Sequence, residues 1–211
     1  MTKITVFLIG CLLCVNTMVA QFTNSSSSNS AQSSDLGGWS GFRISYSPMK
    51  LENDNANVDM DFTGLSAGFV KGVSISSQAP VFVESGASFL WLSAKESGVK
   101  FNIYSIEIPL NIGYRYQAGE EFSVFPYIGL KARGNIAGSA SYGGESVNLF
   151  DEDDMGEDNG TNRFQIGWQV GLGVDFNHIY LSASYGSDFS NLNQADDKFS
   201  SIPSFTLGLN F

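Results

Sequence analysis

The chain has 211 residues, including 23 Gly and 5 Pro, and only 15% of them are charged. This composition suits a single all-β domain better than a helical one. The balance of 11 basic against 21 acidic residues argues against nucleic acid or another polyanion as a partner. After its first residues the chain has no run of about 20 apolar residues, the length a transmembrane helix needs. Strands would therefore have to carry any membrane crossing.

The first 20 residues have the pattern of a secretory signal peptide. Lys3 precedes an apolar run over residues 4–15, and the small residue Ala20 stands directly before Gln21. We predict cleavage after Ala20, so that the mature chain begins at Gln21. Residues 21–37 are rich in Ser and Asn and poor in apolar side chains, which predicts a flexible leader.

The cysteines bear on both export and chemistry. Residues 8–11 end in Cys11 and resemble a lipoprotein processing site, which leaves lipid anchoring open as an alternative. Cys11 and Cys14 both precede the predicted cleavage site. The mature chain is therefore expected to have no disulfide and no thiolate or redox chemistry.

Residues 38–211 consist of eight segments in which apolar and polar side chains alternate. The alternation is clear in residues 104–116, 164–176 and 204–211, and it is weaker in the other five segments, where we attribute the slips to bulges or bends. This pattern predicts one domain, an eight-stranded antiparallel up-and-down transmembrane β-barrel. The predicted strands cover residues 38–47, 64–75, 80–94, 104–116, 122–138, 164–176, 179–188 and 204–211.

Composition decides which face of these strands is expected to point outward. The polar face is mainly Gly, Ser, Gln and Asn, whereas a soluble barrel would need a charged surface. The apolar face carries aromatic residues near the strand ends, as lipid-facing strands do. Alternation alone also fits a soluble periplasmic carrier with an apolar cavity, and this alternative stays open here.

The connections form two sets, one short and one longer and more acidic. Bacterial barrels have short periplasmic turns and longer external loops, which predicts an outer-membrane protein with both termini in the periplasm. The short set comprises residues 76–78, 117–121 and 177–178, and the long set comprises residues 48–63, 95–100, 139–162 and 189–198.

Seven charged residues fall on the polar face and are expected to point into the lumen. Glu107 lies on the strand before Lys131 and Arg133, so the three can face one another and an internal ion-pair network is predicted. Its structural role would be to fill the lumen with paired charges. A gated pathway or a proton-linked site is the functional alternative. The seven residues are Arg43, Glu84, Glu107, Arg115, Lys131, Arg133 and Asp175.

An acidic stretch within residues 145–158 has no basic residue and offers oxygen ligands for Ca²⁺. It is not an EF-hand, because Met155 and Asn162 occupy positions 5 and 12 counted from Asp151. A solvated loop is the simpler interpretation, and we predict no cofactor. The candidate Ca²⁺ ligands are Asp151, Asp153, Asp154, Glu157 and Asp158.

The single histidine, His178, follows Asn177 at a predicted tight turn. A hydrolase of the serine type would need a base beside a nucleophile in a cleft. We therefore interpret His178 as a turn residue and expect the protein not to be an enzyme.

Several short motifs resemble the PorT-like family of outer-membrane β-barrels. They are residues 106–110 (IEIPL), 126–129 (PYIG), 185–186 (YG) and 190–192 (SNL). The closing residues, which end at Phe211, are similar to the signal read by the barrel assembly machinery. The resemblance implies an integral outer-membrane barrel and, through the founding member, an association with protein secretion. No residue here can be matched to a secretion role.

The leading functional hypothesis is a non-enzymatic outer-membrane protein with a structural, adhesion or interaction role. Its expected partners are outer-membrane lipid, the barrel assembly machinery during biogenesis, and a surface partner that the sequence does not identify. The alternatives are a barrel enzyme with a catalytic cluster at its outer rim, the soluble carrier, and an accessory role in secretion.

Overall fold

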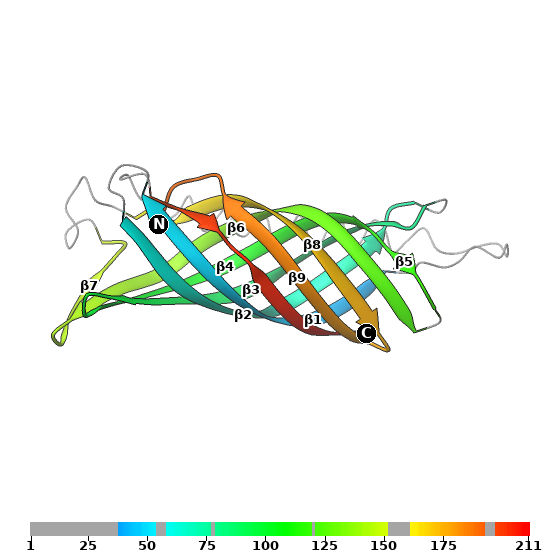
Figure 1. Cartoon of the computed structure of the whole chain (residues 1–211), viewed down its shortest axis with the longest axis horizontal. Helices are drawn as coiled ribbons and strands as arrows, with labels where there is room; N and C mark the ends of the chain where they lie inside the picture. The colour runs from blue at the N-terminus through cyan, green and yellow to red at the C-terminus, as the bar shows by residue number, and fades with distance from the viewer. Residues whose placement is uncertain (1–37, 54–57, 77–78, 120, 152–160, 193–196) are drawn as a thin grey trace. The chain divides into compact units, whose positions relative to one another are not determined.

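A computed structural model describes residues 38–53, 58–76, 79–119, 121–151, 161–192 and 197–211. These residues form a single antiparallel sheet (Figure 1). No helix in the described part of the chain has the length and apolarity to cross a membrane. The predicted signal peptide and leader lie outside the described residues.

The sheet contains eleven strands in chain order. They are β1 (Trp39–Asn53), β2 (Val58–Ser74), β3 (Val81–Glu96), β4 (Val99–Tyr114), β5 (Tyr116–Gln117), β6 (Phe122–Tyr142), β7 (Glu145–Asn148), β8 (Phe164–Phe176), β9 (Ile179–Asp188), β10 (Asp197–Ser201) and β11 (Ser204–Asn210).

The sheet closes on itself, because β1 pairs with β2 on one side and with β10 and β11 on the other. The eleven strands make a ring of eight: β5 and β7 pair only with β6, and β10 and β11 follow one another along β1. Each member of the ring pairs with its neighbours in sequence. The predicted eight-stranded up-and-down barrel is therefore confirmed.

The two ends of the barrel differ in their connections. The "turn end" carries residues 75–76, 79–80, 118–119, 121 and 177–178 together with Phe211, and the "loop end" carries the tips of the β3–β4 and β6–β7 hairpins (Figure 1). At the turn end, Asn177 and His178 both have positive φ, of 46° and 76°. That is the geometry of a two-residue hairpin turn, so His178 is a turn residue, as predicted.

The strands on the loop-end side are longer than the sequence analysis predicted. Residues 48–53 pair with residues 58–63 in β1 and β2, and the predicted loop 95–100 is a two-residue turn at Ser97-Gly98. Residues 139–148 likewise form a hairpin of β6 and β7. The prediction of long loops over 48–63 and 95–100 was therefore wrong.

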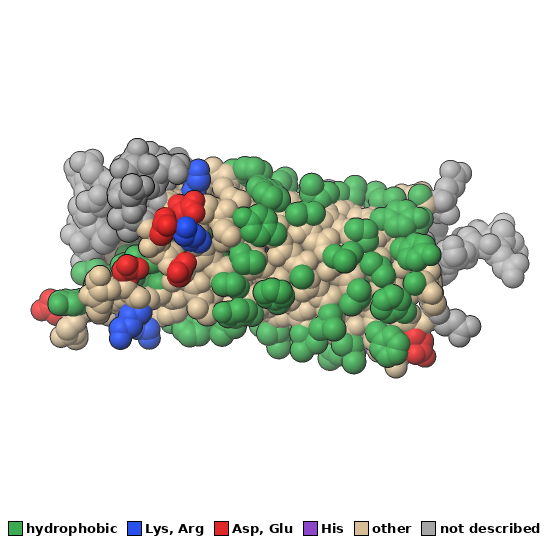
Figure 2. Space-filling view, in the orientation of Figure 1, with side chains coloured by type: hydrophobic (Ala, Val, Ile, Leu, Met, Phe, Trp, Pro, Cys, Tyr) green, Lys and Arg blue, Asp and Glu red, His purple; other side chains and the backbone are tan. Residues whose placement is uncertain are grey.

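The reason is an inversion of polarity along the strands. Over most of the barrel the apolar side chains face outward, as the exposure of Ile44, Leu65 and Leu110 shows. Nearer the loop end the inward positions become apolar, with Met49 and Phe62 almost fully buried, while charged residues take the outward positions. Figure 2 shows the result on one face, an apolar band followed by charged side chains toward the loop end.

This inversion explains the slips in alternation at Leu90 and Leu92, which are buried in the loop-end part of β3. Other slips, at Phe82, Phe125 and Tyr180, are inward aromatic residues near the turn end. The ladder between β1 and β2 runs without a register shift from Trp39 to Asn53, so no bulge is present there. A register shift does occur between β4 and β6, where Ile136 is the extra residue. A second register shift lies between β1 and β10, at Lys50 and Leu51.

Two apolar clusters fill the ends of the lumen. The turn-end cluster consists of Trp39, Phe82, Phe125 and Tyr180, with Tyr127 packed against it. The "loop-end core" is larger and draws on both the strands and the connecting segments. It comprises Met49, Leu51, Phe62, Leu90, Leu92, Ala94, Ile103, Leu149, Leu192, Phe199 and Ile202.

Candidate functional site

The polar interior between the two apolar clusters contains all seven charged residues that the alternation of the strands assigned to the lumen. Five of them are buried, and Glu107 and Arg115 are half-buried. They do not form one network. The structure divides them into a loop-end charge group and a turn-end charge group.

Arg133 on β6 is the centre of the loop-end charge group. Its guanidinium Nη1 lies 3.0 Å from Asp188 Oδ2 and its Nη2 lies 3.3 Å from Glu107 Oε2. Lys131 Nζ lies 3.9 Å from the same Glu107 oxygen, outside hydrogen-bond distance. The guanidinium also stacks over Phe199, at 5.3 Å from the ring centre. It thus connects the charge group to the loop-end core.

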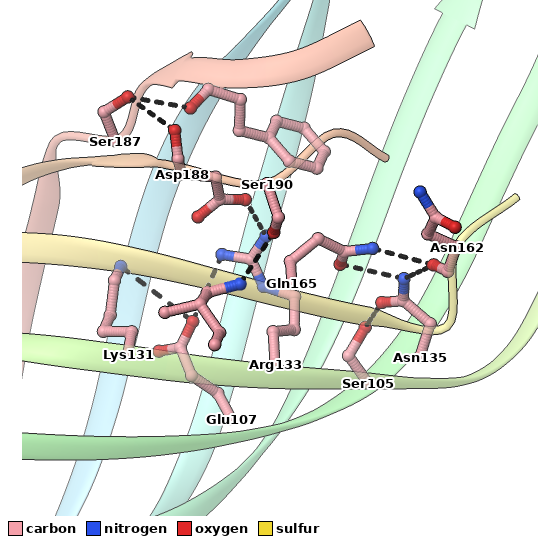
Figure 3. Close-up of polar contacts among 12 residues, drawn as sticks. Ser105, Glu107, Lys131, Arg133, Asn135, Asn162, Gln165, Ser187, Asp188 and Ser190 are labelled. Carbon is pink, nitrogen blue, oxygen red and sulfur yellow. Dashed lines mark hydrogen bonds and ion pairs between the residues drawn. The ribbon is translucent and has the colours of Figure 1, made fainter. Parts of the chain in front are cut away.

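A ladder of amides lies beside this charge group (Figure 3). Ser105 Oγ donates to Asn135 Oδ1 at 2.7 Å, and Asn135 Nδ2 donates to Gln165 Oε1 at 2.9 Å. Asn135 and Gln165 both donate to the Asn162 carbonyl. Asn135 points inward two residues after Arg133, and the extra residue Ile136 follows it, so that Gly138 is the next inward residue of β6.

The turn-end charge group is arranged around Arg43 on β1. Its Nη2 donates to Asn210 Oδ1 at 2.6 Å and lies 3.8 Å from Glu84 Oε2. Asn210 in turn donates to Asp175 Oδ2 at 2.9 Å, and Asp175 pairs with Arg115 at 3.8 Å. The chain of contacts therefore joins the first and last strands of the barrel to β8 and to Arg115, which lies between β4 and β5.

Cation–π contacts fix this group onto the turn-end cluster. The Arg43 guanidinium lies 3.9 Å from the centre of the Tyr180 ring, and the Arg115 guanidinium lies 5.3 Å from Trp39 and 5.0 Å from Phe125. Such contacts are stronger where water is excluded. The aromatic rings and the arginines thus close the turn end together.

A cavity of about 80 Å³ lies between the two charge groups. Lys131 and Glu107 line it from one side, and Arg43 and Glu84 line it from the other. This volume holds several water molecules but not a large substrate. The remaining lining is rich in hydroxyl groups, from Ser45, Ser47, Ser66, Ser88, Ser182, Ser184, Ser204 and Thr206.

Comparison with known families identifies this architecture. Residues 17–211 match the family described as outer membrane protein beta-barrel domain. The chain belongs to this family. It is therefore an outer-membrane protein, and the apolar band is its lipid-facing surface. The soluble-carrier alternative was wrong, because the apolar side chains face outward rather than into a ligand cavity.

Solved outer-membrane barrels of low sequence identity resemble the chain. Ail of Yersinia pestis is 16% identical over 83% of this chain and 99% of its own, with a TM-score of 0.44. Neisserial surface protein A is 16% identical over 82% and 96%, with a TM-score of 0.41. The outer membrane enzyme PagL is 12% identical over 80% and 98%, with a TM-score of 0.41. At these values the likeness carries no argument about activity. No curated protein matches the chain.

Asp188, the carboxylate closest to Arg133 in this outer-membrane barrel, was not among the predicted lumen residues. The sequence contained a signal for it, because Asp188 lies an even number of residues from the inward residues Tyr180 and Gly186 on β9 and therefore shares their face. The uncharged partners Asn111 and Gln169 were also missed. Asn111 Nδ2 donates to Glu84 Oε1 at 3.3 Å, and Gln169 Nε2 on β8 donates to Asn111 Oδ1 at 2.6 Å.

The other candidate sites lie apart from the charged interior. Of the five candidate Ca²⁺ ligands only Asp151 is within the described residues, where it is exposed, so the Ca²⁺ site stays a prediction. No cluster of His, Cys, Asp and Glu suited to a metal ion occurs in the described part of the barrel. At the turn end, His178 Nδ1 lies 3.1 Å from the Asn210 carbonyl oxygen. Phe211 is exposed at the same end.

Proposed function

We propose that the protein is a non-enzymatic, non-conducting barrel of the outer membrane that presents its loop end outside the cell as an interaction surface. The observation that carries the proposal is the inverted segment with its buried loop-end core. A barrel that only crossed lipid would need no second apolar core beyond the membrane. This core packs the described loop-end parts of the strands against one another, which would support a platform for a partner.

The closed lumen supports the non-conducting part of this proposal. The turn-end cluster and the loop-end core fill the two ends, and paired charges occupy the space between them. Eight strands enclose room for little more than side chains. Planar bilayers containing the purified barrel should therefore show no steady ion current. A stable unitary conductance would contradict the proposal.

A cross-linking experiment tests the interaction surface. Tyr142, at the tip of the β6–β7 hairpin, is 66% exposed, and Tyr116, near the turn end, is 59% exposed. A photoreactive residue at position 142 should form protein adducts in living cells. The same residue at position 116 is the matched control and should form lipid or periplasmic adducts. Position 142 without protein adducts would argue against the proposal.

The alternative of an outer-membrane enzyme would require a nucleophile and a base at one rim. The single histidine lies at the turn end, where its ring contacts a backbone carbonyl. An accessory role in protein secretion is suggested by the PorT-like motifs around Glu107 and Tyr127. It would use the same loop-end or turn-end surfaces and is compatible with a closed lumen.

A further inference from the structure

Two lysines stand side by side on the outer surface just beyond the apolar band. Lys95 on β3 and Lys100 on β4 are directly opposite in the ladder, and both side chains are exposed. Like charges in this cross-strand position repel each other. No carboxylate among the described residues forms an ion pair with either lysine. A bound anion would relieve this repulsion.

The position of the two lysines along the barrel axis indicates which kind of anion they would bind. Trp91 and Tyr104 are opposite each other on the same outward face, closer to the lipid band, and Tyr104 stacks on Phe89 with ring centres 6.1 Å apart. Aromatic residues of this kind mark the edge of the apolar band in outer-membrane barrels. The pair therefore lies on the headgroup side of the aromatic edge.

The separation between the aromatic edge and the lysines fits a lipid headgroup. Lys95 is four residue steps beyond Trp91, about 13 Å along a strand and less in height because strands in barrels are tilted. Headgroups extend about 5–8 Å beyond the hydrocarbon on each side. Lysine side chains bridge the remaining distance by extending toward the interface.

Neighbouring residues add polar groups at the same level. Lys100 is opposite Ser141 on β6, and Asn102, the next outward residue on β4, accepts a hydrogen bond from Trp91 Nε1 at 3.4 Å. Ser141 Oγ donates to Ser146 Oγ at 3.2 Å, so the two ammonium groups and the Asn102 amide are the groups suited to a phosphate. We propose that Lys95 and Lys100 together bind the phosphate of an anionic lipid headgroup in the leaflet that surrounds the loop end.

The experiment compares lipid retention in variants of the full barrel. The protein is placed in phosphatidylcholine nanodiscs that contain a minor fraction of phosphatidic acid, and native mass spectrometry measures the ratio of the two lipids it retains. The wild type should prefer phosphatidic acid. Lys95→Ser with Lys100→Ser should lower this preference about 30-fold, since each lysine near an anionic surface contributes about fivefold.

Two matched variants control for folding and for general charge. Lys50 is also on the outward surface near the loop end, but it pairs with Asp59 at 2.9 Å and Glu52 at 3.2 Å, so Lys50→Ser should retain the wild-type preference. Lys95→Arg with Lys100→Arg should retain it too. Heat-modifiable migration on gels verifies that each barrel is folded.

Three results would overturn this inference, which does not depend on the proposed function. They are a wild type without preference for phosphatidic acid, a double serine variant that retains it, and an equal loss in Lys50→Ser. Inorganic phosphate distinguishes the source of the anion. It should not displace phosphatidic acid when added at equal concentration, and displacement would show a free-phosphate site instead.

Discussion

At the scale of single residues, the interior of the barrel depends on charges that are buried in pairs. Arg133 is 2% exposed and has two carboxylate partners, Glu107 and Asp188. A buried ion pair contributes little net stability compared with an apolar pair, but loss of one partner leaves an uncompensated charge. The lumen should therefore tolerate paired replacement better than single replacement.

Arg133→Met tests this argument. The free energy of unfolding in lipid vesicles, measured by urea titration, should fall by about 3–5 kcal/mol because Asp188 keeps a buried charge without a cation. Arg133→Met combined with Asp188→Leu should recover much of the loss. The exposed ion pair of Lys50 is the control, and Lys50→Met should leave the unfolding midpoint unchanged. A single variant as stable as the wild type would contradict the pairing.

Glycines on the polar face make room for large side chains. A Cβ at Gly171 would clash with Cζ of Tyr127, whereas a Cβ at Gly134, which is on the outward face of β6, would meet no atom within 4 Å. Gly171→Val should therefore displace Tyr127 and lower the free energy of unfolding by about 1–3 kcal/mol. Gly134→Val is the control on the outward face. Equal stability of the two variants would show that Tyr127 has free space to move.

At the scale of elements, each long hairpin has two parts with opposite polarity. In β1 and β2 the membrane part presents Ile44 and Leu65 to lipid, and the loop-end part buries Met49 and Phe62 and exposes Asp61. The same two strands thus present apolar side chains outward to lipid over one stretch and charged side chains outward to water over the next. The hydrophobic effect stabilises only the second stretch by burial from water.

Two adjacent residues on β2, one inward and one outward, test whether burial in the loop-end core stabilises the barrel. Phe62 is 4% exposed and contacts Phe199 edge to face, with ring centres 5.5 Å apart. Phe62→Ala should cost about 3–5 kcal/mol of stability, and its outward neighbour Asp61→Ala should change stability by less than about 0.5 kcal/mol. Chemical unfolding monitored by fluorescence measures both. Similar effects of the two substitutions would mean that the loop-end core is not packed.

Much of the barrel could be predicted from the sequence, because a period of two residues survives in every strand. Inward charges such as Arg43 and Glu107 followed from parity alone. The loop-end extension could not be predicted from a rule in which the apolar side chains always face outward. Under that rule Lys50-Leu51-Glu52 is assigned to a loop, because its charged residues take the outward positions. Ion-pair partners also depend on register, which the bulge at Ile136 shifts and the alternation does not reveal.

At the scale of the whole molecule, the barrel is a closed cylinder that is anchored by lipid and extended into water. Its family membership and apolar band place it in the outer membrane. Its filled ends favour a role on the surface over transport through the lumen. On this basis the polarity inversion should mark the membrane boundary, with the loop end outside the cell.

Cysteine labelling of intact cells tests this orientation. Each variant would carry a single cysteine in its mature chain, because Cys11 and Cys14 both precede the predicted mature N-terminus. Single substitutions Asp61→Cys and Leu65→Cys lie on the outward face of β2, and Ala118→Cys lies at the turn end. A membrane-impermeant maleimide should label position 61 rapidly, position 65 only after unfolding, and position 118 only after the outer membrane is permeabilised. Equal labelling of positions 61 and 65, or labelling of 118 in place of 61, would contradict the account.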